Sequence, residues 1–182
     1  LCVEDEHRIL YEKSSGFGRF DFVHNALPEC SLADISTETS LLGRKFSFPL
    51  FFSSMTGGYA GGGAVNSIIA AFCERHRLPF GVGSQRVMLE HPEEIRSFEI
   101  VRKLAPTAFI AANIGGTQVA GGLSPAARNR LVESIAADAI IVHLNPLQEL
   151  MQPEGDRDFT GVLAGISELA AWASVPVIVK ET

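Results

Sequence analysis

Ala139-Ile140-Ile141-Val142-His143-Leu144 is a short apolar run that turns polar toward its end, and similar runs recur along the chain. Each is apolar on both faces and rich in Val, Ile and Phe, which is typical of a parallel strand that is covered on both sides. The other four lie about 30 residues apart, with a longer last step, at residues 48–52, 78–82, 108–112 and 175–179. The sequence therefore predicts one strand in each period.

Helical patterns separate these runs. After Pro92 the apolar side chains recur at every third residue, as one face of a helix requires (Ile95, Phe98, Val101 and Leu104). Ser124 and Pro125 supply an N-cap and a proline at the first helical position, which predicts the start of another helix. A third helix is expected to begin near Asp158.

Strict alternation of strand and helix predicts an α/β fold. The repeat is close to the roughly 31 residues per unit of an eightfold barrel, which indicates a (β/α)₈ TIM barrel. A doubly wound parallel sheet is the competing architecture. The glycines at residues 57–63 form no Gly-x-Gly-x-x-Gly pattern with an acidic partner about 20 residues further on, so a dinucleotide-binding fold is weakly supported.

Only five strands are expected, whereas a closed barrel of this type needs eight. We therefore expect residues 1–182 to form the N-terminal part of a single barrel domain. Residues 1–47 would be an N-terminal segment that caps the bottom of the barrel, and residues 48–182 would supply barrel strands one to five.

Charge and composition exclude several classes of function. The formal net charge is −6 and no run of Lys or Arg occurs, so no nucleic-acid or anionic membrane surface is expected. The apolar stretches are far shorter than the roughly 20 residues that span a bilayer. Cys2, Cys30 and Cys73 are widely spaced, which argues against a disulfide framework or a zinc site and favours a cytoplasmic location. A small anionic ligand stays compatible with this composition.

Hydrogen-bonding side chains follow every apolar run, and in barrels of this class the catalytic groups come from the carboxyl ends of the strands. In chain order, the segments that follow the runs are Ser53-Ser54-Met55-Thr56-Gly57-Gly58, Gly83-Ser84-Gln85-Arg86, Asn113-Ile114-Gly115-Gly116, His143-Leu144-Asn145-Pro146-Leu147-Gln148-Glu149 and Lys180-Glu181. We expect them to form one site.

Each segment also has a structural explanation. Met55 and Thr56 suit either a turn in which Thr56 caps a helix or the floor under a flat heterocycle. Arg86 is either an exposed loop residue or a bidentate phosphate anchor. Asn113 needs partners to offset its burial, and Lys180 at the end of an apolar strand is costly unless it meets an anion or an electron-rich ring.

The segment after the fourth run has the highest density of polar groups. Glu149 is either a solvated helix charge or, together with phosphate oxygens and water, a ligand of Mg²⁺. His143, Asn145 and Gln148 are candidate catalytic residues, although each of them alone is also an ordinary hydrogen-bonding side chain.

Six blocks of the sequence, in this order, resemble the type 2 isopentenyl-diphosphate isomerase family. They are Val23-His24-Asn25-Ala26-Leu27-Pro28, Ser53-Ser54-Met55-Thr56-Gly57-Gly58, Gly81-Val82-Gly83-Ser84-Gln85-Arg86, Ala112-Asn113-Ile114-Gly115, His143-Leu144-Asn145-Pro146-Leu147-Gln148-Glu149 and Val175-Pro176-Val177-Ile178-Val179-Lys180-Glu181. The resemblance implies an isomerase of isoprenoid biosynthesis that interconverts isopentenyl diphosphate and dimethylallyl diphosphate with reduced FMN, Mg²⁺ and NADPH.

The resemblance also implies roles for individual residues. FMN contacts are expected from Ser54, Met55, Thr56, Ser84, Asn113 and Lys180, and substrate contacts from Ser84, Gln85, Arg86 and Gln148. Glu149 would bind Mg²⁺, and His143 and Asn145 would line the diphosphate region. No side chain here is an obvious strong acid for an unactivated alkene, which favours proton transfer at the flavin, with Gln148 as a relay or positioning group.

The family's N-terminal Arg-Lys pair and its late phosphate-binding loops are expected outside the sequence given. The resemblance further implies a homo-oligomer, tetrameric or octameric. Two alternatives stay open, namely an FMN barrel oxidoreductase of the hydroxy-acid oxidase type and a non-catalytic flavin-binding remnant.

Overall fold

A computed structural model describes residues 14–56, 61–153 and 155–181 of the chain. The chain divides into two units, Leu1–Ser36 and Thr37–Thr182. The described part of the first unit contains two short 3-10 helices, η1 (Phe17–Arg19) and η2 (Leu32–Asp34), within extended chain. Most of its apolar side chains are exposed to solvent, among them Phe17, Phe20, Phe22, Val23, Leu27 and Leu32.

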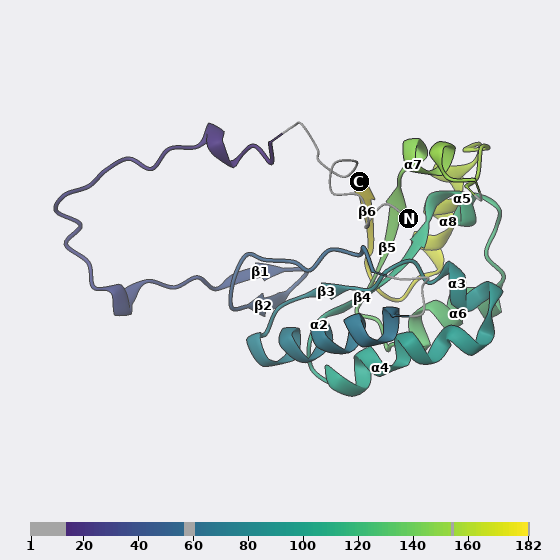
Figure 1. The fold of residues 1–182 in the computed structure, drawn as a ribbon, viewed down its shortest axis with the longest axis horizontal. Helices are drawn as coiled ribbons and strands as arrows, with labels where there is room; N and C mark the ends of the chain where they lie inside the picture. The colour runs from purple at the N-terminus through teal and green to yellow at the C-terminus, as the bar shows by residue number, and fades with distance from the viewer. Residues whose placement is uncertain (1–13, 57–60, 154, 182) are drawn as a thin grey trace. The chain divides into compact units, whose positions relative to one another are not determined.

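A four-stranded parallel sheet organises the second unit (Figure 1). Its strands are β3 (Phe80–Gly81), β4 (Ile110–Gly115), β5 (Ala139–Leu144) and β6 (Val177–Glu181). They lie in the order β3-β4-β5-β6, so each strand pairs with its neighbour in the sequence. In the described part of the chain β6 has β5 on one side and no strand on the other.

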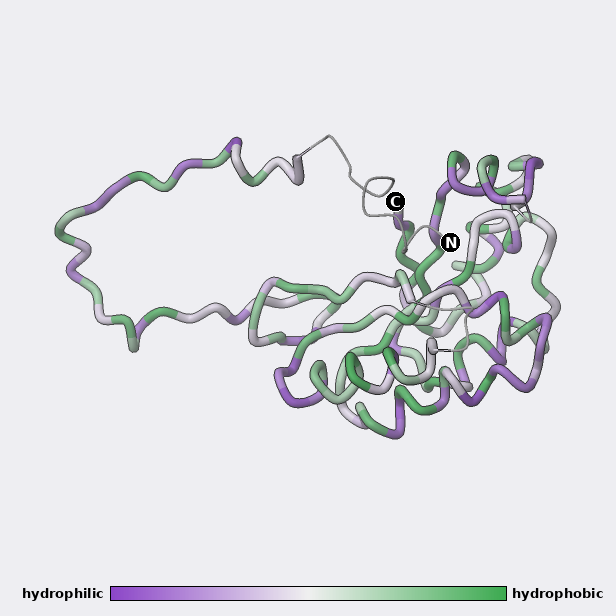
Figure 2. The backbone as a smooth tube through the Cα atoms, in the orientation of Figure 1, coloured by the Kyte–Doolittle hydropathy of each residue, from purple (hydrophilic) through white to green (hydrophobic). Residues whose placement is uncertain are grey.

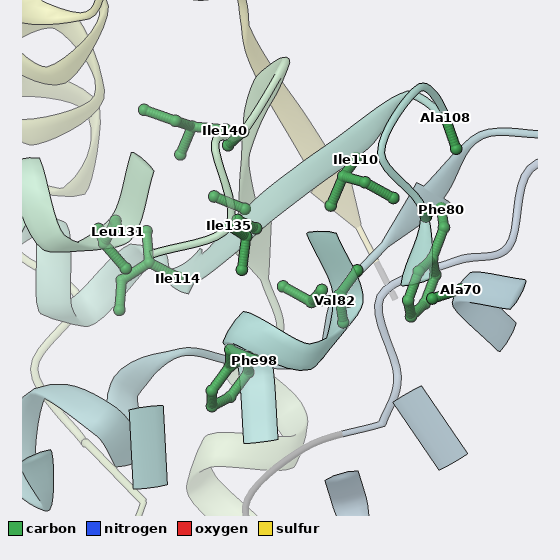
Figure 3. Close-up of a cluster of buried hydrophobic side chains, with 14 of the residues drawn as sticks. Ala70, Phe80, Val82, Phe98, Ala108, Ile110, Ile114, Leu131, Ile135 and Ile140 are labelled. Atoms are coloured by element: carbon green, nitrogen blue, oxygen red, sulfur yellow. The ribbon is translucent and has the colours of Figure 1, made fainter. Parts of the chain in front are cut away.

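The helices of this unit pack against one face of the sheet. They are α2 (Gly62–His76), α3 (Arg86–Glu90), η3 (Pro92–Ile95), α4 (Arg96–Leu104), α5 (Gly116–Ala120), α6 (Pro125–Glu133) and α8 (Val162–Trp172). The short helix α7 (Pro146–Met151) is an exception, because it contributes no residue to this core. Figure 3 shows Phe98 of α4 and Leu131 of α6 in the buried cluster that also contains Ile114 of β4 and Ile140 of β5. The main core therefore lies between the helices and one face of the sheet. Figure 2 shows the hydropathy of the strands along the chain.

The opposite face of the sheet carries a different and smaller cluster. Phe46, Phe109, Ala139 and Ile141 are buried there together with Ala111, and none of these residues belongs to a helix. Phe46 comes from an antiparallel hairpin of β1 (Thr39–Leu41) and β2 (Arg44–Phe46), and its ring meets that of Phe109 edge to face at 5.9 Å. The hairpin thus packs near the amino ends of the strands.

Arg102 and Asp138 fasten the same end of the sheet. The Arg102 guanidinium donates to the backbone oxygens of Ala105, Ala108 and Ile135 and, at 2.9 Å, to the Asp138 carboxylate. Asp138 also accepts the Ile110 N–H that opens β4, at 2.9 Å, and a bond from Arg44 of the hairpin at 3.3 Å. Through two ion pairs, the Asp138 carboxylate therefore links α4, two strand starts and the hairpin.

The expected alternation of strand and helix is confirmed, but the first expected strand is wrong. Of residues 48–52 only Phe52 is bridged to the sheet, opposite Phe80. Pro49 lacks a backbone N–H and cannot serve as a ladder donor, which confines proline to strand edges and ends. The consecutive strand order contains no reversal of the kind that a doubly wound sheet requires.

Of two predicted helix starts, one is confirmed and the other is wrong. Ser124 caps α6 as expected, because its Oγ accepts the Ala127 N–H and Pro125 follows. The helix expected near Asp158 begins only at Val162. Asp158 instead accepts the Thr160 N–H at 2.8 Å, and Gly161 at φ 83° interrupts helical geometry just before α8. None of the helices in the described residues has the length and hydrophobicity that a membrane span requires.

Candidate active site at the carboxyl ends of the strands

We call the sheet face that carries the smaller cluster (Phe46, Phe109, Ala111, Ala139 and Ile141) the helix-free face, because none of these residues belongs to a helix. Along this face the side chains change from apolar to polar toward the carboxyl ends of the strands. Alternate residues of a strand point to the same face, so on β5 this face shows Ala139, Ile141 and then His143. His143 is paired with Lys180 on β6, and Asn113 on β4 lies within hydrogen-bond distance of the His143 ring. The apolar part joins the small core, and the polar part is free to bind a ligand.

Two adjoining hollows open at this polar end. The first is a cavity of about 120 Å³ lined by Ser54, Met55, Ser84, Asn113, His143, Asn145, Gln148, Glu149 and Lys180. The second, of about 360 Å³, is lined by Met55, Ser84, Arg86, Val87, Glu90, Gln118, His143, Gln148, Glu149 and Gln152. The two share five lining residues, so we treat them as one site. Segments that are far apart in the sequence meet here, as expected for a binding site.

His143 is held as a neutral ring. Its Nδ1 lies 2.9 Å from Oδ1 of Asn113, an arrangement that suits the tautomer with the hydrogen on Nδ1, in which Nε2 keeps its lone pair. Burial lowers the pKa of His143, and the charge of Lys180 lowers it further, while Glu149 acts in the opposite direction. In this tautomer the Nε2 atom of the ring is a hydrogen-bond acceptor.

Lys180 has few partners for a charged group in its position. Its Nζ donates to the backbone oxygen of Ser54 at 3.1 Å and lies 3.9 Å from the Met55 sulfur. Among the described side chains it has no carboxylate within ion-pair distance, and burial lowers the pKa of Lys180. The hydroxyl of Ser54 is buried without a hydrogen-bond partner in the described part of the chain. Both groups have bonding capacity left for a polar ligand.

The short helix α7 supplies the amides and the carboxylate. Asn145 directly precedes α7, and its side-chain amide donates to the side-chain oxygen Oε1 of Gln148. One oxygen of the half-buried Glu149 accepts the Asp156 N–H at 3.1 Å. Gln118 on α5 in turn donates to the Asp156 carboxylate at 3.1 Å. These bonds fix the direction of the Glu149 carboxylate at the rim of the site.

Arg86 stands at the mouth of the larger hollow. Its Nε donates to Glu90, one turn further along α3, at 2.8 Å. The bond to Glu90 raises the pKa of Arg86, and the charges of Glu90, Asp156 and Glu149 raise it as well. The two terminal nitrogens of the guanidinium stay available for an anion.

Comparison with known proteins bears on what this site does. No protein-family model matches the chain. The chain is similar to isopentenyl-diphosphate delta-isomerases. The protein of that name from Chlorobium limicola is 50% identical over 169 residues, which are 93% of this chain and 47% of the relative.

Relatives from other groups of organisms give the same result. The isopentenyl-diphosphate delta-isomerase of Synechococcus sp. is 49% identical over 170 residues, covering 93% of this chain and 49% of its own length. That of Methanoregula boonei is 45% identical over 182 residues, covering 100% of this chain and 50% of its own. The chain spans about half the length of the curated relatives it matches.

Nine of the residues expected from the resemblance to isopentenyl-diphosphate isomerases line the smaller cavity, and Arg86 lines the larger one. Thr56 is half-buried and lines neither cavity, so its flavin contact stays a prediction. The Gln85 side chain is 0% exposed and lines neither cavity, so its position does not support the expected substrate contact. Glu90 and Gln118 were missed, because an amide or a carboxylate on a helix gives no signal in a single sequence.

Proposed function

We propose that the complete protein is an isopentenyl-diphosphate delta-isomerase that interconverts isopentenyl diphosphate and dimethylallyl diphosphate. The observation that carries the proposal is the polar group of Asn113, His143 and Lys180 on the helix-free face, with Glu149 in the same cavity. The chain that carries this polar group is 50% identical over 169 residues to a protein of that name. The isomerisation moves a double bond without net redox change, so the site must direct protons and hold a diphosphate.

We further propose that the parallel sheet is the first part of a (β/α)₈ barrel whose interior is the helix-free face. A consecutive strand order with the helices on one face supports this proposal. The location of the polar groups at the carboxyl ends of the strands supports it as well, since active sites of such barrels are found there.

FMN suits the groups on one side of the cavity. The Ser54 hydroxyl, the Lys180 ammonium and the Asn113 amide would hold the polar edge of the flavin, with Ser84 in the same cavity. Thr56, which directly follows Met55 in the sequence, would be a further flavin contact. Met55 is 73% exposed and is able to cover one face of a flat ring. When bound and reduced by NADPH, the flavin would supply the proton transfer that no side chain of the site is acidic enough to perform.

Mg²⁺ suits the other side. Among the described residues no group of three or more His, Cys, Asp or Glu side chains is arranged around a metal position. Glu149 alone is therefore the protein ligand that we assign to Mg²⁺, with diphosphate oxygens and water completing the shell, as is usual for this ion. The requirement for a diphosphate would couple metal binding to substrate binding.

The remaining residues would orient the substrate. Arg86 would grip the diphosphate through its terminal nitrogens while Glu90 holds its Nε. His143 would accept a hydrogen bond at Nε2, or a proton from the diphosphate region. Gln148, whose carbonyl is engaged by Asn145, keeps its N–H groups for the substrate and would act as a positioning or relay group.

The decisive experiment incubates the complete protein anaerobically with FMN, NADPH, Mg²⁺ and isopentenyl diphosphate and follows dimethylallyl diphosphate. We expect product, and no NADPH consumption beyond the initial reduction. The absence of product with a fully reduced flavin would refute the isomerase. Oxygen uptake with 2-hydroxy acids would instead indicate an oxidoreductase, and flavin binding without either reaction a non-catalytic module.

We also propose that the complete protein is a homo-oligomer, a tetramer or an octamer. The proposal rests on the resemblance to the isomerase family. Light scattering coupled to gel filtration measures the assembly directly, and a monomer across the concentration range would contradict it.

A further inference from the structure

Gln85 is a buried polar residue at the centre of the structure. It follows β3 and precedes α3, and its side chain is 0% exposed. Its backbone N–H donates to the backbone oxygen of Asn113 at 2.8 Å, and its side-chain Oε1 accepts the backbone N–H of Asn113 at 3.0 Å. The strand β3 ends at Gly81, so Gln85 provides the hydrogen bonds that a longer strand would otherwise give to Asn113.

The other end of the same amide is anchored in the core. Its Nε2 donates to the Leu131 oxygen at 3.1 Å and to the Ser134 hydroxyl at 3.2 Å, both near the end of α6. The Met88 sulfur lies 3.8 Å away. With both its oxygen and its nitrogen engaged and no exposed surface, the amide has no group left for a substrate.

Asn113 transmits this fixed position to the cavity. Its backbone is bound by Gln85, while its side-chain oxygen accepts from Nδ1 of His143 at 2.9 Å. Displacement of Asn113 would free the imidazole to turn or to move its hydrogen to Nε2, the atom on the side of Gly115. A series of hydrogen bonds thus connects α6 with the Gln85 amide, Asn113 and the imidazole of His143.

We infer that Gln85 is a positioning residue, which clamps Asn113 so that His143 presents an unprotonated Nε2 to the substrate. The inference rests on the proposed isomerase function for its catalytic meaning, but the state of the ring can be measured without substrate. It replaces the expected direct contact between Gln85 and the substrate.

The test compares Gln85→Met, which keeps the volume but removes both amide functions, with Gln85→Glu, which keeps the acceptor for Asn113. Asn66→Leu is the matched control, because Asn66 is a 1% exposed amide that donates to the Ser97 oxygen outside the site. Nitrogen-15 spectra of the imidazole rings are recorded on the complete, ligand-free proteins. Gln85→Asn, which withdraws the amide by one methylene, replaces Gln85→Met if the latter does not fold.

In the wild type and in Asn66→Leu we expect one His143 tautomer with the hydrogen on Nδ1. Gln85→Met should give a mixture with hydrogen on Nε2, and Gln85→Glu should restore the single form. In isomerase assays kcat should fall about tenfold in Gln85→Met with KM unchanged, and recover in Gln85→Glu.

An unchanged His143 spectrum in a folded Gln85→Met or Gln85→Asn protein would overturn the inference. A rise in KM alone would overturn it in favour of a substrate contact. A protein that makes no dimethylallyl diphosphate but shows the tautomer change would refute the proposed function while leaving the positioning role intact, so the two failures are distinguishable.

Discussion

His143 and Lys180 occupy paired positions on β5 and β6, and both line the same cavity. Burial and the neighbouring ammonium hold the pKa of His143 below its ordinary value of 6.5. A protonated imidazole beside an ammonium at a strand end would be unfavourable without a nearby anion. The pair is therefore better understood as a site prepared for an anionic ligand.

A dependence of stability on pH follows from this pair. The unfolded chain takes up a proton at His143 near the ordinary value of 6.5, whereas the folded chain does so only at lower pH. The unfolded state thus binds more protons in this window, and the free energy of unfolding falls as the pH is lowered from about 7.5 to about 5.5. His143→Asn should flatten this part of the curve in urea titrations, and an unchanged slope would contradict the prediction.

Glu149→Gln should raise the Mg²⁺ concentration for half-maximal activity of the complete protein by about tenfold or more, because the one protein carboxylate assigned to the ion is lost. The matched control is Glu168→Gln, whose side chain is 69% exposed on α8 and pairs with Arg128. Activity measured across a Mg²⁺ titration decides the matter. The same half-saturation in both variants would remove Glu149 from the metal site.

Gly165→Ala should destabilise the protein by about 1–3 kcal/mol. A Cβ at Gly165 would lie 2.5 Å from the backbone oxygen of Val119, so α8 would have to move away from α5. Gly121→Ala is the control, since its Cβ would meet the nearest atom at 3.6 Å with an ordinary φ. Thermal unfolding of both variants provides the measurement, and equal midpoints would show that the two helices adjust without cost.

Arg102→Met should cost about 3–5 kcal/mol, because it leaves the Asp138 carboxylate without its closest cation and several buried carbonyls without a donor. Arg130→Met, on the exposed side of α6, should stay within about 0.5 kcal/mol of the wild type. Chemical denaturation compares the two. A small effect at Arg102 would mean that water replaces the guanidinium.

Much of the fold could be predicted from local patterns. Continuous apolar runs indicated β4, β5 and β6, and Ser124 with Pro125 fixed the start of α6. The first strand was not predictable from hydrophobicity, because Pro49 is compatible with an apolar run but not with a ladder of hydrogen bonds. Gly161 shifted the start of α8 through its backbone angle, which hydrophobic periodicity does not report.

The site shows the same division. Asn113, His143 and Lys180 were predictable, since a polar residue that ends an apolar strand needs a partner or a ligand. Gln85 has the same chemistry and follows a strand in the same way, yet it faces the core, and a single sequence cannot tell which way a loop amide turns. Gln118 reaches the site only through Asp156, a contact between segments 38 residues apart.

The outer edge of β6 has a consequence for handling the 182-residue chain. In the described part of the chain, the peptide groups along this edge have no partner strand, and Val179 beside them is 52% exposed. Such an edge is a template for strand addition between molecules and so favours aggregation.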